Sequence, residues 1–397
     1  MRFFKFITGY CFLIVIAAAP AAADTYNSAE RTSAFDIQSD ILGETREIFV
    51  RTPPVFDENE TYPVVYVPDG EWNFELVASY LDYMMDNEIY PNVIVTGARN
   101  INRNRDFIPR PDPNFEDTGG ADAFLEFVEA EWIAAVEDAY PASGERIFIG
   151  HSFGGVIALH ALFSKPDLFD AYIALSASAW MSDRVLFEEA EAFFDGDKAA
   201  GQFVYMAPGE GDGGPTTPSG AALAEIFAER APETLEWTFD ITPKTDHFKN
   251  FVSGMHDAFM ALFPAWGFVE EMTARAEQDS AAGVDAWFEE KEAALGYRFH
   301  PSWFDFGVAA IRLSAAEHNA AAETLIERLI MIYPDSPHIA AFAAQTFENN
   351  GAFDRAVSEY ARAIEIAEDR DLHPNVIHLE RLGKGLARVE EKARAQD

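Results

Sequence analysis

Cysteine is almost absent from this 397-residue chain, since its single cysteine, Cys11, lies in an apolar N-terminal stretch. The rest of the chain therefore has no disulfide, no thiol nucleophile and no cysteine-based metal site. Basic residues are also scarce: 29 Lys and Arg stand against 67 Asp and Glu, which gives a formal net charge of −38. Such an acidic surface repels phosphate backbones and anionic lipids, so nucleic acid and membrane surfaces are not expected partners.

Long apolar runs are lacking beyond the N-terminus. There, Arg2 and Lys5 precede an apolar stretch that ends in the small-residue run Ala21-Ala22-Ala23. A membrane-spanning helix needs about 20 apolar residues, and Pro20 interrupts this shorter one. We therefore expect a signal peptide over residues 1–23 and a periplasmic or secreted bacterial protein that is not inserted in a membrane after cleavage. Removing Arg2 and Lys5 would change the charge from −38 to −40.

Short β-branched runs alternate with amphipathic stretches from residue 35 to about 240, a pattern that predicts a mainly parallel sheet with helices on both faces. The predicted strands are Phe35–Leu42, Arg46–Arg51, Val64–Val67, Val93–Thr96, Arg146–Ile149, Ala171–Leu175, Phe203–Met206 and Glu236–Phe239. The predicted helices are Phe74–Met85, Ala121–Tyr140, Gly154–Phe163, Asp183–Phe194, Ser219–Arg230 and Phe251–Leu262. The sequence thus predicts an α/β domain over residues 24–265.

Strand-forming residues give way to Ala, Glu and Leu at helical spacing after about residue 265, so residues 266–397 are predicted to form a smaller all-α domain. A possible repeat relates Ala322, Ile326 and Leu329 to Ala356, Tyr360 and Ala363, each 34 residues later. This period resembles the tetratricopeptide repeat. A plain helical appendage is the alternative. A repeat of this kind would offer a surface for a protein partner.

The segment Gly150-His151-Ser152-Phe153-Gly154 follows an apolar strand and opens an amphipathic helix. In this strand–turn–helix context a serine flanked two residues away by glycines has a strained backbone, and bulkier flanking residues would clash. Ser152 is therefore predicted to be a nucleophile. The N–H of Phe153 would lie at the N-terminus of the helix, where it can stabilise an oxyanion. His151 is expected to fill the underside of the turn.

The partners of such a serine follow in the order acid, then histidine. The strand Phe203–Met206 leads into a loop that holds Glu210 and Asp212, and both are in reach. We favour Glu210, one residue past the turning glycine, with Asp212 as the alternative acid. His247, in the loop after the last strand, is the predicted base.

The second oxyanion donor should follow the strand Val64–Val67. Gly70 permits a backbone turn there, so the N–H of Glu71 is the predicted donor.

These segments together resemble the esterase-D-like putative esterase family of α/β hydrolases, in particular its branch of periplasmic siderophore trilactone esterases. The resemblance spans about residues 60–262 and rests on Tyr62–Phe74, Asn100–Pro109, Gly119–Leu125, Gly150–Gly155, Ala174–Trp180 and Asp246–His247. It implies the α/β-hydrolase fold, Ser152 as nucleophile, His247 as base, and oxyanion donors at Glu71 and Phe153. The acid is weak or absent in the siderophore esterases.

The sequence therefore predicts a serine hydrolase that cleaves small-molecule carboxylic esters through an acyl-enzyme, with no metal and no organic cofactor. An acyltransferase with the same residues is one alternative, and a non-catalytic binding protein with a docking helical tail is another. Arg103 and Arg105 could bind an anionic substrate or else form arginine–carboxylate pairs that fix a loop. Trp72 and Trp180 could line the substrate pocket or belong to the core.

Overall fold

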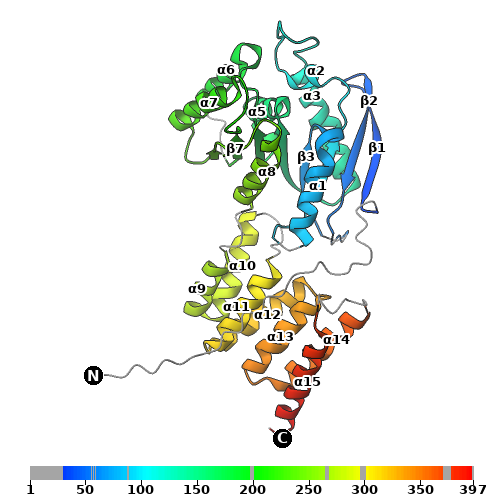
Figure 1. Cartoon of the computed structure of the whole chain (residues 1–397), viewed down its shortest axis with the longest axis vertical. Helices are drawn as coiled ribbons and strands as arrows, with labels where there is room; N and C mark the ends of the chain where they lie inside the picture. The colour runs from blue at the N-terminus through cyan, green and yellow to red at the C-terminus, as the bar shows by residue number, and fades with distance from the viewer. Residues whose placement is uncertain are drawn as a thin grey trace, which may run out of the picture. The chain divides into compact units, whose positions relative to one another are not determined.

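The protein is described from a computed structural model. The described residues are 30–54, 56, 58, 60–86, 89–196, 201–263, 268–295, 301–369 and 377–395. The predicted signal peptide, residues 1–23, lies outside them. The described residues divide into two compact units (Figure 1). The first, called here the catalytic unit, comprises residues 30–271 with 286–302; the second, the helical unit, comprises residues 272–285 with 303–395.

An eight-stranded sheet is the centre of the catalytic unit, with strand order β1-β2-β4-β3-β5-β6-β7-β8. Its strands are β1 Thr32–Ser39, β2 Glu44–Arg51, β3 Tyr62–Val67, β4 Ile94–Ala98, β5 Ala142–His151, β6 Ala171–Leu175, β7 Phe203–Ala207 and β8 Glu236–Phe239. The pairs from β4 to β8 are parallel, whereas β1 and β2 form an antiparallel hairpin at one edge and β2 pairs antiparallel with β4. This confirms the predicted α/β-hydrolase sheet.

The two faces of the sheet carry different helices, because successive side chains of a strand point to opposite faces. Val65 and Val67 pack with α1 (Gly70–Asp86) and α8 (Lys249–Leu262). Val64 and Tyr66 pack on the opposite face, in a second hydrophobic cluster that also holds residues of further helical segments of the catalytic unit. Those helical segments are α2 Arg103–Phe107, α3 Ala121–Phe127, the π-helix η1 Val128–Ile133, α4 Ala134–Ala139, α5 Phe153–Ser164, the 3₁₀ turn η2 Pro166–Leu168, α6 Met181–Asp195 and α7 Thr216–Arg230.

Helix α6 begins with an unusual turn. Ser182, Asp183 and Arg184 have φ values of 47°, 56° and 63°, all in the left-handed region. This conformation costs L-residues about 1–2 kcal/mol each. Asp112 fixes the turn, since its carboxylate accepts a 2.8 Å hydrogen bond from the Ser182 N–H. The loop that contains Asp112 and the start of α6 are thereby fastened together.

After α8 the described residues form helices and no strands, as predicted: α9 Phe268–Asp279, α10 Ala281–Leu295, α11 Trp303–Ala315, α12 Asn319–Ile332, α13 Pro337–Asn349, α14 Phe353–Asp369 and α15 Leu379–Arg394. Helices α11 and α13 begin 34 residues apart, at 303 and 337, and so do α12 and α14, at 319 and 353. The six residues of the possible repeat are all buried. The tetratricopeptide resemblance and the domain boundary at residue 265 stay predictions.

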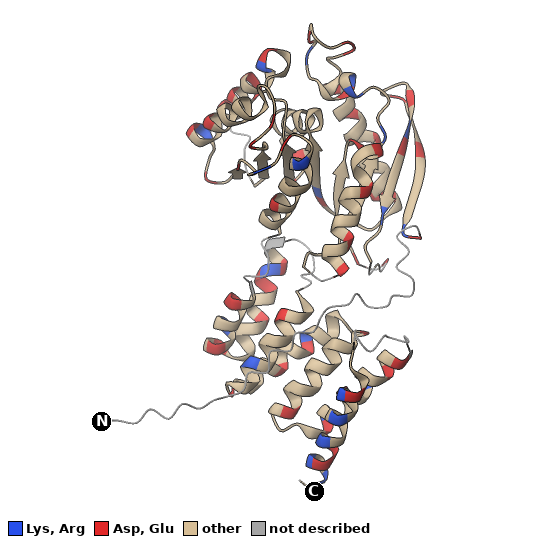
Figure 2. Cartoon of the chain, viewed as in Figure 1, with Lys and Arg blue, Asp and Glu red and all other residues tan. Residues whose placement is uncertain are grey.

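Charged side chains are scattered over both units, with alternating signs along α15 (Figure 2). Within the part of the chain that the structure describes, no helix combines the length and the apolar character needed to cross a bilayer.

Candidate active site

The turn between β5 and α5 has the geometry that the sequence predicts. Ser152 has φ of 60° and ψ of −114°, a strained conformation for a non-glycine residue. A Cβ on Gly150 would lie only 1.9 Å from the Gly154 carbonyl oxygen, so no larger residue fits there. A Cβ on Gly155 would lie 2.9 Å from the Cβ of Ala177, so this glycine lets α5 approach the residues after β6 closely.

His247 is held by a buried carboxylate. Its Nδ1 lies 2.9 Å from Oδ1 of Asp212, whose side chain is fully buried. Burial alone would raise the pKa of Asp212, but hydrogen bonds from His247, the Ser176 hydroxyl and the Gly209 N–H outweigh it and keep that pKa below its usual range. Asp212 is therefore ionised at neutral pH and fixes Nδ1 as the protonated nitrogen of the ring. The other ring nitrogen, Nε2, is left to accept a proton.

The structure overturns the preference for Glu210 as the acid beside His247. The chain from Gly209 to Asp212 is a tight turn in which the Asp212 N–H donates to the Gly209 carbonyl at 3.1 Å. This turn brings the Asp212 carboxylate back toward His247. Glu210 instead is exposed, and its carboxylate accepts the Lys244 N–H at 2.8 Å. The alternative acid of the sequence analysis is thus the one that contacts the histidine.

His151 links the nucleophile turn to the histidine loop. Its Nε2 lies 2.6 Å from the backbone carbonyl oxygen of His247, and the two rings are 4.7 Å apart. A carbonyl oxygen only accepts hydrogen bonds, so Nε2 carries the proton. Burial lowers the pKa of His151 to about 4, so the ring is neutral at physiological pH. The residue before Ser152 therefore holds the backbone of His247, as expected of a residue beneath the turn.

The two residues predicted to be oxyanion donors lie at helix N-termini. Glu71 is the second residue of α1 and Phe153 the first residue of α5. Within the described residues neither backbone N–H has a hydrogen-bond acceptor. Free N–H groups at the start of a helix attract negative charge. The Glu71 carboxylate points elsewhere, since it accepts the Asn100 N–H at 3.0 Å.

The arginines between β4 and α3 are each paired with carboxylates, which neutralises their charge. Arg105 contacts Glu44 and Asp106, so it fixes its loop to β2 as the structural alternative predicted. Arg103 makes two hydrogen bonds to Asp69, from Nε at 2.6 Å and from Nη2 at 2.9 Å. Neither arginine therefore needs a bound ligand to balance its positive charge.

Aromatic rings flank Phe153. The Phe115 ring lies 5.5 Å from that of Phe153 and 6.4 Å from that of Trp180. Trp180 is half-buried, and its Nε1 is buried without a hydrogen-bond acceptor among the described residues. Trp72 is 65% exposed and covers the Arg103 guanidinium at 5.5 Å. Trp72 is thus a surface residue rather than a core one.

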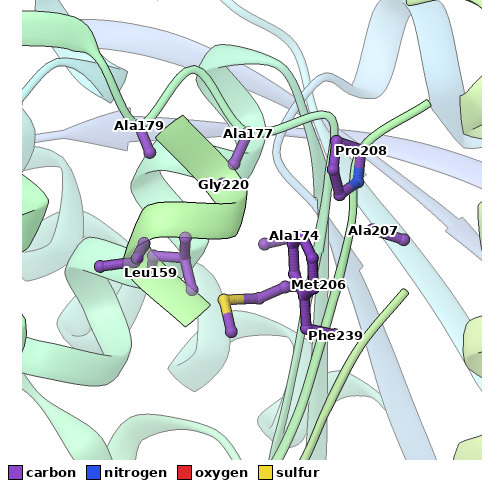
Figure 3. A pocket seen from close by; sticks show the side chains of 10 residues that line it. Leu159, Ala174, Ala177, Ala179, Met206, Ala207, Pro208, Gly220 and Phe239 are labelled. Atoms are coloured by element: carbon purple, nitrogen blue, oxygen red, sulfur yellow. The ribbon is translucent and has the colours of Figure 1, made fainter. Parts of the chain in front are cut away.

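A small apolar cavity lies between α5, α7 and the ends of β6 and β7 (Figure 3). It is lined by Leu159, Ala174, Ala177, Ala179, Met206, Ala207, Pro208, Gly220, Leu223 and Phe239. None of these residues has a titratable side chain. In the described part of the chain, no three His, Cys, Asp or Glu side chains gather in a way that could hold a metal ion.

Comparisons with known proteins show the family of this chain. The model of a family described as putative esterase matches residues 39–259. The siderophore triacetylfusarinine C esterase of Aspergillus fumigatus is 43% identical over 84 residues, which are 21% of this chain and 29% of that protein. The ferri-bacillibactin esterase BesA of Bacillus subtilis is 29% identical over 189 residues, covering 42% of this chain and 65% of that protein. The chain thus spans less than two thirds of the length of either curated relative.

Solved structures extend the likeness. The crystal structure of an IroE-like serine hydrolase from Shewanella oneidensis superposes with a TM-score of 0.61 at 26% identity, over 76% of this chain and 99% of that one. An uncharacterised protein from Capnocytophaga ochracea matches 91% of this chain and 99% of its own with a TM-score of 0.57. At 17% identity the latter likeness concerns the fold alone.

Proposed function

Because this chain belongs to the putative esterase family, we propose that it is a serine hydrolase that cleaves carboxylic esters through a covalent acyl-enzyme. The observation that carries the proposal is the Asp212–His247 hydrogen bond, together with the contact of the His247 carbonyl oxygen with His151, the residue before the strained Ser152. An ionised carboxylate on Nδ1 leaves Nε2 of His247 ready to take the serine proton.

Acyl transfer would proceed in two steps. In the first, His247 takes the proton of Ser152 while the serine oxygen attacks the ester carbonyl. His247 then gives this proton to the alcohol, which leaves. The N–H groups of Glu71 and Phe153 would stabilise the oxyanion. In the second, His247 takes a proton from water, whose oxygen attacks the acyl carbonyl; the bond to Ser152 then breaks, His247 returns the proton to the Ser152 oxygen, and the acid is released.

Siderophore esters are the first substrates to test. The relatives named above act on a triacetylfusarinine and a bacillibactin siderophore by their names. The partly exposed ring of Phe153, the residue after Ser152, and that of Phe115 beside it offer apolar contacts for the acyl group of such an ester. We propose the same substrate class for the present chain. We also propose that the mature protein is exported from the cytoplasm and that a protein partner docks on the helical unit.

A fluorophosphonate probe tests the nucleophile. The wild-type protein should be labelled and should hydrolyse p-nitrophenyl esters, whereas Ser152→Ala should lose labelling and at least about 10³-fold in kcat/KM. Ser164→Ala is the matched control, because this serine is on the same helix, α5, but is exposed. It should be labelled like the wild type. Labelling of Ser152→Ala would refute the assignment.

A further inference from the structure

Arg103 connects the two segments that hold the oxyanion donors. Besides its two hydrogen bonds to Asp69, its Nη2 donates a 3.0 Å hydrogen bond to the carbonyl oxygen of His151. Asp69 lies two residues before Glu71, and His151 lies two residues before Phe153. One guanidinium therefore joins the loop after β3 to the turn after β5.

Asp69 is held in place within the loop after β3. Its side chain is 2% exposed, and its Oδ1 accepts a further hydrogen bond, 2.8 Å long, from Asn100 Nδ2. Its backbone oxygen accepts the N–H groups of Trp72 and Asn73, so the residue also caps α1. A rotation of the Asp69 side chain would therefore move the start of α1, where the Glu71 N–H lies.

Asp69 also contacts the other half of the site. A Cβ built on Gly154 would lie 2.9 Å from Asp69 Oδ2, so the carboxylate packs directly against the first turn of α5. The contact leaves no room for a side chain at position 154. The separation of the Glu71 and Phe153 N–H groups is thus set by the Asp69–Arg103 pair and by this contact.

The pair is shielded from solvent. The Arg103 side chain is 18% exposed, and its guanidinium lies 5.3 Å from the Phe107 ring and 5.1 Å from the Phe153 ring. Hydrogen bonds between charged groups are stronger in such surroundings and fix geometry better than exposed ones. The nearby pair Arg110–Glu188 is not shielded in this way, since its side chains are 50% and 64% exposed.

We propose that Arg103 is a positioning residue of the esterase site: it holds the loop after β3 and the nucleophile turn at the separation at which the N–H groups of Glu71 and Phe153 together bind the oxyanion. The inference rests on the proposed function, because it concerns the oxyanion of that reaction. It assigns Arg103 a role other than binding an anionic substrate.

Arg103→Lys is the main test, made in the full-length protein. Lysine keeps the charge but cannot form two parallel hydrogen bonds to Asp69 and also reach the His151 carbonyl. A displacement of about 1 Å in a catalytic site costs about 10²-fold in rate, so kcat should fall by about 10- to 100-fold. KM should stay within about threefold for both p-nitrophenyl butyrate and the anionic mono-p-nitrophenyl succinate. Arg110→Ala is the matched control and should keep the wild-type kcat.

A trifluoromethyl ketone that forms an oxyanion on the serine gives a second readout. Its inhibition constant should rise in Arg103→Lys by about the factor by which kcat/KM falls. Added ethylguanidinium should restore part of the kcat of Arg103→Ala. If Arg103→Lys does not fold, Asp69→Asn, which keeps the shape of the side chain, should give the same loss of kcat at an unchanged KM.

Two results would overturn the proposal. One is a kcat within twofold of wild type in Arg103→Lys and Asp69→Asn. The other is a KM that rises at least tenfold for the succinate ester alone while kcat is unchanged, which would make Arg103 a substrate-binding residue. Failure of the proposed function is distinguishable, because it would be seen as ester hydrolysis that survives in Ser152→Ala.

Discussion

The two units of this protein use their polar residues in different ways. In the catalytic unit, buried arginine–carboxylate pairs tie together segments distant in sequence, as Arg46–Asp106 and Arg51–Asp82 do with nearly inaccessible side chains. In the helical unit the helices pack mainly through apolar side chains, both small and large, such as Ala322, Leu325 and Phe347. A repeat needs only an approximate fit between neighbouring helices, whereas a catalytic site needs single atoms fixed in place. Substitutions of carboxylates should therefore have different consequences in the two units.

The largest difference is expected at the acid of the catalytic unit. Asp212→Asn should reduce kcat by about 10³- to 10⁴-fold, because an amide no longer fixes the protonated Nδ1 of His247. Steady-state kinetics on a p-nitrophenyl ester measure the loss. Glu210→Gln is the control two residues away and should stay within about twofold of wild type, since its carboxylate contacts only the Lys244 N–H. Equal losses in both variants would contradict the assignment of Asp212.

A buried carboxylate of the helical unit should affect stability alone. Glu348 is 7% exposed and contacts Arg388 and Lys392 of α15. Glu348→Gln should lower the stability of the helical unit by about 1–3 kcal/mol, because the buried side chain loses its charged hydrogen bonds with Arg388 and Lys392, and should leave kcat unchanged. Hydrogen exchange of α13 to α15 measures this. Glu391→Gln, at an exposed position, is the control. A fall in kcat without faster exchange in Glu348→Gln would contradict the prediction that Glu348 affects stability alone.

The acidity of Glu348 adds a pH dependence. Burial would raise its pKa, but Arg388 and Lys392 outweigh it and lower that pKa to about 2. A group with a depressed pKa in the folded state stabilises it above the unfolded value of about 4.5. That contribution is lost as the pH falls from about 4.5 toward 2.

The smallest effect is expected at a histidine of the catalytic unit. His160 on α5 is buried between Glu189 on α6 and Asp122 on α3. Burial alone would lower its pKa, but the two carboxylates outweigh this and raise it. The stabilisation is then complete below about pH 6.5 and is lost as the pH rises through the raised folded value. His160→Gln should therefore cost about 1 kcal/mol more at pH 6 than at pH 9. Thermal unfolding of wild type and variant at both pH values measures this difference. An equal loss of stability at pH 6 and pH 9 would contradict the ion pairs of His160.

The sheet, its helices and the order of the site residues could be predicted, because each depends on a local pattern. Ser152 and its glycines lie within five residues, and alternating runs locate the strands. The choice of Asp212 over Glu210 could not be predicted from distance along the chain. It depends on the turn at Gly209, in which the Asp212 carboxylate accepts the Gly209 N–H at 2.8 Å. A glycine followed three residues later by Asp was the only sequence signal for it.

The partners of Arg103 were beyond sequence reasoning for a different reason. Arg103 contacts Asp69, which is 34 residues away and on another element, and only the assembled sheet brings them together. The short helix α2, predicted as a loop, places that arginine. Its signal was Asn102, whose side chain accepts the Arg105 N–H at 3.1 Å as an N-cap.

The left-handed turn at Ser182, Asp183 and Arg184 has a consequence for protein engineering. Three consecutive residues there keep a backbone that glycine would adopt without penalty. A search for a more heat-resistant variant of the protein would therefore begin at this turn, where the backbone itself and not the packing of the core holds back stability.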